Sequence, residues 1–209
     1  MDNNIKFYNN FINQLSTENV RHRRIYQSLD MLPKGNVLDI GCGCGLSSKR
    51  LADGDRNVIA FDYSDKAIDY ARKNNNHEKI EYVCSDILDF ETDVKFDSIC
   101  LIDIIEHLHE NTVNDIIKLI DQCSKPSTII YINIPYNYTL RYLINTKFKG
   151  LQPIEKPYSI KDLMNIFIGI DYIPFKMELY WVQYVEMFFC KTSSFNDTMR
   201  IIYNTNTGA

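Results

Sequence analysis

Residues 37–45 read Val-Leu-Asp-Ile-Gly-Cys-Gly-Cys-Gly, an apolar stretch with one acid that runs into three glycines at alternate positions. Glycine lets the backbone turn tightly and approach a ligand where a Cβ would not fit. A dinucleotide-binding turn requires Gly-x-Gly-x-x-Gly, which brings a helix N-terminus to a pyrophosphate. Leu46 stands where the third glycine of that pattern would fall. The spacing therefore argues against a dinucleotide-binding turn.

Length and composition describe one globular domain. The chain has 209 residues, of which 45% are hydrophobic and 24% charged, so it can bury a sizeable core. No stretch reaches the roughly 20 apolar residues of a membrane span, and residues 1–4 lack the features of a secretory signal. Six scattered cysteines favour reduced thiols, so we expect a cytoplasmic protein. The net charge of −4 argues against extensive nucleic-acid binding.

Four apolar stretches in the first half of the chain each lead to an acid. They are residues 37–40 with Asp39, 58–61 with Asp62, 80–84 with Asp86, and 98–102 with Asp103. Helical patterns over 45–53 and 65–74 separate the first three. This alternation predicts a parallel sheet with helices on both faces. Ligands of such sheets bind at the carboxyl ends of the strands, so the four acids mark the expected site.

The second half of the chain continues the pattern and then changes it. We expect a helix over 112–123 opened by a Thr112-x-x-Asp115 capping box, a fifth strand over 128–134, an irregular aromatic and basic stretch over 136–158, and a helix from Ser159-x-x-Asp162 to Phe167. Strands over 172–179 and 183–192 predict a hairpin at the sheet edge that turns about Tyr180–Val182. Residues 196–209 are expected to be a peripheral tail.

Taken in order, these motifs over residues 25–192 resemble a class I S-adenosylmethionine-dependent methyltransferase. The pieces that carry the resemblance are 37–45, Phe61-Asp62, Ser85-Asp86-Ile87 and Phe96-Asp97 followed by Asp103-Ile-Ile-Glu106-His107-Leu108. They are similar to the small-molecule branch that includes ubiquinone-biosynthesis O-methyltransferases. The resemblance implies an α/β, Rossmann-like doubly wound sheet, mostly parallel, with an antiparallel C-terminal hairpin strand. It also implies one methyltransferase domain over 1–195, with 1–34 as a helical lid and 136–158 as a cap over the substrate.

The resemblance implies S-adenosyl-L-methionine as the cofactor and assigns residues to it. They are Asp39, Gly41, Gly43, Gly45, Asp62, Tyr63, Asp86, Ile87 and Ile102. A carboxylate at Asp62 can accept hydrogen bonds from both ribose hydroxyls, and Tyr63 can pack on the ribose or adenine. Asp86 would accept from the adenine amine with Ile87 near the ring. Asp39 would orient the glycine loop, and Gly41 and Ile102 would lie beside the methionine portion.

His107 is the candidate general base, and Asp103 joins it as the second candidate catalytic residue. Methyl transfer is an in-line displacement, and a hydroxyl acceptor must lose its proton, which an imidazole can take near neutral pH. A surface position for His107 at the start of a helix explains the sequence equally well, and His109 is expected to face solvent. Asp103-x-x-Glu106-His107 is similar to a segment of metal-dependent small-RNA 2′-O-methyltransferases. No histidine follows it to complete a metal site, so we expect none.

The acceptor is the least determined feature of the sequence. We expect a small molecule methylated at oxygen, no nucleic acid, and an oligomeric state that the sequence leaves open. One alternative is methylation of RNA or protein. Another is a non-catalytic, cofactor-binding partner subunit, which would show an exposed apolar patch around Trp181 and Phe188. The basic run 21–24 is expected to be the solvated face of an N-terminal helix.

Overall fold

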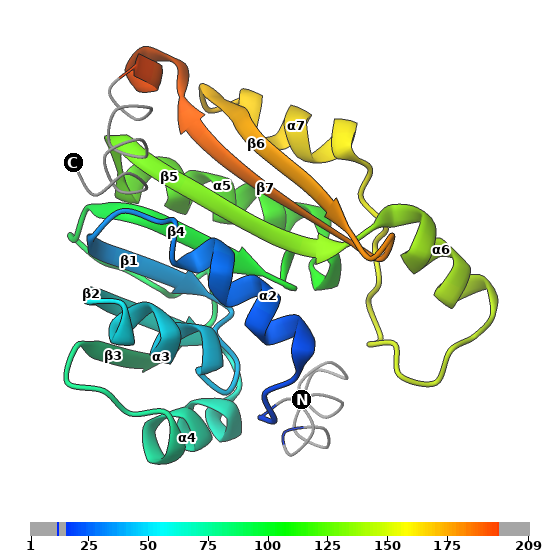
Figure 1. Ribbon diagram of the computed structural model, residues 1–209, viewed down its shortest axis with the longest axis horizontal. Helices are drawn as coiled ribbons and strands as arrows, with labels where there is room; N and C mark the ends of the chain where they lie inside the picture. The colour runs from blue at the N-terminus through cyan, green and yellow to red at the C-terminus, as the bar shows by residue number, and fades with distance from the viewer. Residues whose placement is uncertain (1–11, 13–15, 197–209) are drawn as a thin grey trace.

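The computed structural model describes residue 12 and residues 16–196. A seven-stranded sheet lies between two layers of helices (Figure 1). The elements in chain order are α2 (Val20–Leu29), β1 (Gly35–Ile40), α3 (Leu46–Asp53), β2 (Arg56–Asp62), α4 (Asp65–Asn74), β3 (Ile80–Cys84), β4 (Phe96–Ile102), the 3₁₀ turn η1 (Ile105–His107), α5 (Glu110–Cys123), β5 (Ser124–Pro135), α6 (Asn137–Asn145), α7 (Ile160–Ile168), β6 (Tyr172–Tyr180), β7 (Tyr184–Lys191) and η2 (Thr192–Ser194).

The strand order is β3-β2-β1-β4-β5-β7-β6. The first five strands pair in parallel, and β7 pairs antiparallel with both β5 and β6. This confirms the predicted doubly wound sheet with an antiparallel hairpin at its edge. Because β1 pairs with β2 on one side and β4 on the other, the strand order reverses at its carboxyl end. Sheets of this kind bind ligands at that reversal.

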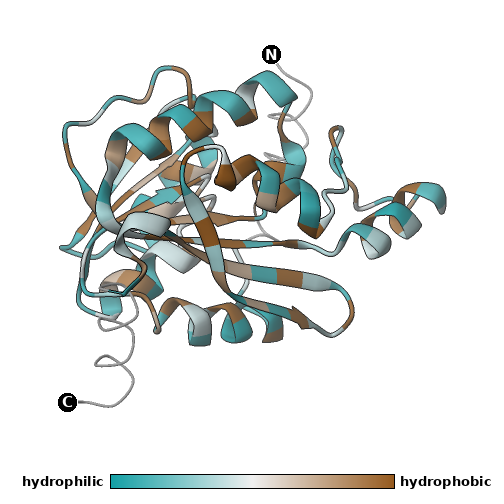
Figure 2. Cartoon of the chain, turned by 90° about the horizontal axis from the view of Figure 1, so that it is seen from above, coloured by the Kyte–Doolittle hydropathy of each residue, from teal (hydrophilic) through white to brown (hydrophobic). Residues whose placement is uncertain are grey.

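Two apolar cores cover the two faces of the sheet. One packs α5 and α7 on the sheet through residues such as Ile116 and Phe167. The other packs α2, α3 and α4 through residues such as Leu29, Leu51 and Ile68. Figure 2 shows hydrophobic residues along the strands and hydrophilic residues over the outer faces of the helices. Burial on both faces explains why the strands read as nearly continuous apolar runs.

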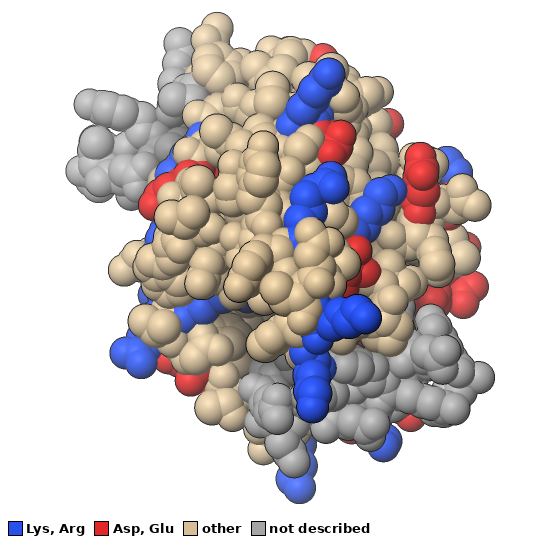
Figure 3. All heavy atoms as spheres, turned by 90° about the vertical axis from the view of Figure 1, so that its right-hand side faces the viewer, with Lys and Arg blue, Asp and Glu red and all other residues tan. Residues whose placement is uncertain are grey.

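The stretch over 136–158 contains a helix, α6, where the sequence predicted irregular structure. Leu140 is buried, while Tyr138 and Tyr142 on the outer side of the helix are exposed, so no long apolar stripe marks it in the sequence. Helix α6 and the loop after it project beyond the end of the sheet (Figures 1 and 2). Figure 3 looks at this end of the molecule and shows basic side chains spread over a largely uncharged surface.

The observed starts of the helices and strands match the predicted starts only in part. The Ser159–Asp162 capping box forms at α7 as predicted. The Thr112–Asp115 box does not form, because α5 begins earlier, at Glu110, behind a His109 cap whose side chain makes no capping hydrogen bond. Strand β5 also begins earlier than predicted, at Ser124, and includes Pro126 near its start. Among the described residues, no helix is long and apolar enough to cross a membrane.

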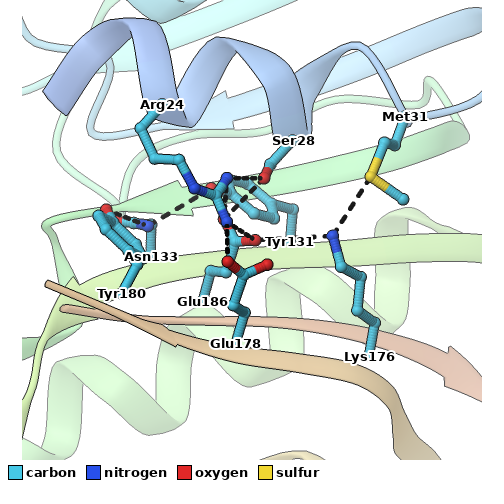
Figure 4. Close-up of polar contacts among 9 residues, drawn as sticks. All are labelled: Arg24, Ser28, Met31, Tyr131, Asn133, Lys176, Glu178, Tyr180 and Glu186. Carbon is cyan, nitrogen blue, oxygen red and sulfur yellow. Dashed lines mark hydrogen bonds and ion pairs between the residues drawn. The ribbon is translucent and has the colours of Figure 1, made fainter. Parts of the chain in front are cut away.

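Helix α2 is fixed to the sheet by a buried polar network (Figure 4). Arg24 donates to Glu186 of β7 (Nη2···Oε1, 2.9 Å), and the Ser28 hydroxyl donates to the other carboxylate oxygen at 2.7 Å. The Tyr131 hydroxyl also donates to Glu186 (3.1 Å), whose side chain is fully buried. The predicted solvated face over 21–24 is therefore wrong for Arg21 and Arg24, whose side chains are 18% and 17% exposed.

Candidate functional site

A cavity of about 300 Å³ opens at the carboxyl ends of β1, β2 and β4. Asp39 and Gly41 line it from β1, Asp62 and Tyr63 from β2, and Ile102 and Asp103 from β4. The glycine loop and the start of α3 also line it, and further walls come from four other places: Arg21, His22 and Ile25 of α2; Asp86 and Leu88 after β3; His107, His109 and Thr112 around the start of α5; and Gln152 and Ile154 in the segment after α6. The cavity therefore lies at the predicted place, the strand-order reversal.

The glycine loop between β1 and α3 has a backbone that requires glycine. Gly41 has φ +69°, and a Cβ there would lie 2.7 Å from Cδ1 of Ile104. Gly45 has φ +79°, and a Cβ there would lie 2.9 Å from that of Ala71. Both conformations are left-handed, which side chains rarely adopt. Gly41 and Gly43 line the cavity, whereas Gly45 caps α3 beside it.

Asp62 and Asp39 are buried acids at neighbouring strand ends. Asp62 Oδ2 accepts the Gly43 N–H and Oδ1 accepts the Ser64 N–H, both at 2.9 Å. Burial raises the Asp62 pKa to about 6 against these hydrogen bonds. Asp39 accepts the Ser48 hydroxyl at 2.6 Å, and burial, opposed by this hydrogen bond, raises its pKa to about 7. No described cation pairs with either carboxylate, so the pair is suited to a ligand that brings hydroxyl donors or positive charge.

The residues after β3 reach the cavity in a different way from the sequence expectation. Asp86 lines it and is exposed, with its carboxylate accepting the Leu88 N–H at 3.0 Å. Ile87 packs against the core on the α5 side and does not line the cavity. Leu88, which is 65% exposed, lines it instead. A side chain near an adenine ring would therefore come from Leu88, one residue along.

Asp103 is held by helix α2. Its φ is +54°, and its N–H donates to the Asn133 carbonyl at 2.8 Å. The guanidinium of Arg21 donates to both oxygens of the Asp103 carboxylate, and its Nη2 donates to Oδ1 of Asn133 at 2.7 Å. The Tyr184 ring lies 4.0 Å below the guanidinium carbon. Arg21 thus closes one side of the cavity and neutralises the acid at the end of β4.

His107 also lines the cavity, and its Nδ1 contact assigns a tautomer. Its Nδ1 is 3.0 Å from the Ile154 carbonyl oxygen, which can only accept, so the proton is assigned to Nδ1 and the lone pair to Nε2. Glu155 Oε2 is 3.6 Å from Nδ1, and Glu106 Oε1 is 3.9 Å from Nε2. Burial and then the nearby Asp103 charge raise the Glu106 pKa well above its ordinary value. His107 is therefore oriented by the segment after α6.

The sequence did not reveal every residue of this site. The sequence predicts a solvated face for Arg21, but Arg21 lines the cavity. It shares a helical face with the buried residues Ile25 and Ser28, and this spacing indicates that its side chain points inward. Gln152 and Ile154 carry no periodic signal, because the segment that holds them has no regular structure. His109 is exposed as expected but lines the same cavity as His107. Within residues 16–196, no group of three or more His, Cys, Asp or Glu side chains is arranged to hold a metal ion.

Comparison with known proteins agrees with this geometry. Residues 37–127 match the family model described as a methyltransferase domain. The chain is 28% identical over 162 residues to a ubiquinone biosynthesis O-methyltransferase from Actinobacillus pleuropneumoniae serotype 7 (strain AP76), covering 68% of this chain and 67% of the relative. It is 37% identical over 71 residues to a malonyl-[acyl-carrier protein] O-methyltransferase from Acetivibrio thermocellus, and this match covers 33% of this chain and 25% of the relative. The chain thus spans a quarter to two thirds of these relatives.

The fold itself recurs in solved methyltransferase structures. A DhpI–SAH complex superposes with a TM-score of 0.71 at 13% identity and covers 90% of this chain and 95% of that one. In its matched domain and its relatives the chain is similar to methyltransferases, and its fold is similar to that of solved S-adenosylmethionine-dependent methyltransferases. The structure of DhpI contains bound SAH, and the two relatives named above are both O-methyltransferases.

Proposed function

We propose that this chain transfers a methyl group from S-adenosylmethionine to a hydroxyl oxygen of a small molecule, with His107 as the general base. The observation that carries the proposal is a single cavity shared by two kinds of residue. The glycine loop, Asp39 and Asp62 line one part, and His107 and Asp103 line another. The expected cofactor residues and the candidate catalytic residues therefore face the same cavity. The relatives' activity as O-methyltransferases supports oxygen as the acceptor atom.

The residues at the strand ends fit the cofactor. The Asp62 carboxylate accepts backbone N–H groups of Gly43, Ser64 and Tyr63, and its oxygens have lone pairs with which they can also accept hydrogen bonds from ribose hydroxyls. The raised pKa values of Asp39 and Asp62 fall back towards their ordinary range when a positive charge enters the cavity. Gly41 and Gly43 present bare backbone there. The bound cofactor supplies an activated methyl group on sulfur, so the protein mainly aligns the acceptor.

His107 would take the proton of the acceptor hydroxyl on Nε2. Its Nδ1–H donates to the Ile154 carbonyl, so the free lone pair is already in place. The Glu155 carboxyl, 3.6 Å from Nδ1, can stabilise the imidazolium that forms. The acceptor oxygen then forms a bond to the methyl carbon, and the carbon–sulfur bond pair stays on sulfur. His107 returns its proton to water after release.

Calorimetric titration with S-adenosylhomocysteine tests the cofactor site. We expect the Asp62→Ala variant to bind at least about tenfold more weakly than the unmodified chain, which corresponds to about 1.4 kcal/mol. Asp69→Ala is the matched control, since Asp69 is an exposed acid on α4 away from the cavity. Equal affinity in all three proteins would remove Asp62 from the cofactor site, and no heat from the unmodified chain would remove the proposal.

Methyl transfer from radiolabelled S-adenosylmethionine to a panel of small hydroxyl compounds tests the base. We expect His107→Asn to lower turnover by about 10²-fold or more near neutral pH, the range of general base catalysis, without changing the affinity for S-adenosylhomocysteine. His77→Asn, which removes a histidine that does not line the cavity, should keep full turnover. Cofactor binding without transfer to any acceptor would favour the non-catalytic partner subunit. Unchanged turnover in His107→Asn would reject His107 as the base.

A further inference from the structure

The turn between β6 and β7 has a strained backbone and exposed apolar side chains. Trp181 and Val182 are its central residues, with φ +51° and +55°, and the Gln183 N–H donates to the Tyr180 carbonyl at 3.1 Å to close it. Turns of this geometry favour Asn-Gly, and a β-branched residue in this region is an outlier. The two side chains are 48% and 72% exposed, so folding gains little from them. Because the strained backbone at these two residues is not offset by burial of their side chains, we expect it to serve a function other than stabilising the fold.

Helix α6 lies directly beside this turn. Thr139 Oγ1 donates to the Val182 carbonyl at 2.8 Å, and the Tyr136 N–H donates to the Gln183 carbonyl at 2.7 Å. Tyr138 and Tyr142 stand one helical turn apart on α6, and both are about two-thirds exposed, at 69% and 67%. Phe148 in the following loop is 57% exposed. Five large apolar or aromatic side chains thus gather on one projecting end, more than isolated surface residues would explain.

The segment that contains α6 and its following loop is basic, although exposed Asp162 interacts with Arg141. Residues 136–154 contain Arg141, Lys147 and Lys149, all exposed, and no Asp or Glu, although the whole chain has a net charge of −4. Arg141 lies between the two tyrosines on α6, so aromatic and basic side chains alternate along its outer face. Glu178, the acid on β6 nearest to the turn in the sequence, is paired with Arg24. Figure 3 shows this end with basic side chains over a largely uncharged surface.

We propose that this end, which we call the tip surface (α6, its following loop and the β6–β7 turn), docks on an anionic phospholipid membrane. Tryptophan and tyrosine favour the headgroup region of a bilayer, where one part of the ring is apolar and the other polar. Basic side chains beside them are attracted to anionic headgroups. Helix α6 and its following loop project from the molecule, where a lipid surface can reach them (Figure 1). This docking is peripheral and independent of the proposed methyl transfer.

The only tryptophan of the chain is at this turn, so its fluorescence reports directly on docking. We expect vesicles of phosphatidylglycerol and phosphatidylcholine to shift Trp181 emission to shorter wavelength and to sediment the protein, whereas pure phosphatidylcholine vesicles do neither. About 1 M salt, at which charges are screened beyond about 3 Å, should weaken the docking. Absence of both the shift and the sedimentation with anionic vesicles would overturn the proposal.

Two variants separate the tip surface from general charge effects. The pair Lys147→Glu and Lys149→Glu should abolish sedimentation, while Lys66→Glu with Lys73→Glu, the same charge change on α4, should not. Val182→Asn relieves the strained turn because Asn tolerates left-handed backbone, so it should fold well, keep its affinity for S-adenosylhomocysteine and dock more weakly. Vesicle docking that all of these variants retain would contradict the proposal. Self-association lost in Val182→Asn, without vesicle binding, would assign the surface to a second copy instead.

Discussion

Asp39 and Asp62 show at the scale of the residue why acids stand at these strand ends. A buried carboxylate without a cation favours its protonated form, and burial raises the pKa values of the two groups to about 7 and about 6. The Ser48 hydroxyl at Asp39 and three backbone N–H groups at Asp62 offset this only in part. A cationic ligand would therefore stabilise the charged forms of these two carboxylates, which are unfavourable in the free protein. This property is expected of a binding site.

The raised pKa of Asp39 makes stability depend on pH in a definite direction. The folded-state value of about 7 lies above the ordinary value of 3.8, so between these values the folded state binds more protons than the unfolded state. Stability should therefore fall as the pH rises through this window, by up to about 1.4 kcal/mol per pH unit from this group. Asp39→Asn removes the carboxyl and should flatten this fall in urea unfolding of the ligand-free protein.

The pH dependence of the stability of Asp39→Asn is compared with that of a control variant. Asp69→Asn, on the exposed face of α4, should follow the unmodified chain at every pH. Asp62 stays in both proteins and contributes a smaller fall of the same sign, because its pKa is also raised. If Asp39→Asn and the unmodified chain lose stability in parallel as the pH rises, Asp39 is not protonated in the fold near neutral pH.

At the scale of the element, the sequence predicted what is encoded locally. The bounds of α4 and β3 match the prediction at both ends, because Ser64 caps α4 and the apolar periods are regular. Helix α6 was missed since its outer face is aromatic and its Tyr136 cap makes no side-chain hydrogen bond. The burial of Arg21 and Arg24 depends on Asp103 and Glu186, which are 82 and 162 residues away. No local pattern contains such partners, so a charge run looked like a solvated surface.

Helix α2 offers a prediction at this scale. Arg24→Met leaves the fully buried Glu186 carboxylate without its main cation, and breaking a buried pair in this way costs about 3–5 kcal/mol. The urea midpoint should fall accordingly, and adding Glu186→Leu should recover much of the loss, because an apolar pair removes the unpaired charge. Arg23→Met is the matched control, since the Arg23 side chain is 70% exposed. Equal midpoints for Arg24→Met and Arg23→Met would show that the network does not hold α2.

At the scale of the whole molecule, the sheet joins segments that are distant in the sequence. Strand β7 lies between β5 and β6, so the C-terminal hairpin cannot separate without exposing the hydrogen-bonding edge of β5. Glu186 of β7 also binds α2 near the start of the described chain. The cavity is built from both halves, with the glycine loop in one and Gln152 and Ile154 in the other. The fold therefore joins the two sets of cavity-lining residues and the hairpin in one sheet.

This coupling predicts a single unfolding transition. Trp181 reports on the β6–β7 turn and far-ultraviolet circular dichroism reports on all helices, so the two urea curves should coincide. S-adenosylhomocysteine at about 100 times its dissociation constant should raise the free energy of unfolding by about 2.7 kcal/mol in both curves. Asp62→Ala, assayed at the same concentration, should show a smaller rise. A fluorescence transition at lower urea concentration than the dichroism transition would mean that the hairpin unfolds separately. A fluorescence midpoint that the ligand does not change would mean that the cavity does not couple the two halves of the chain.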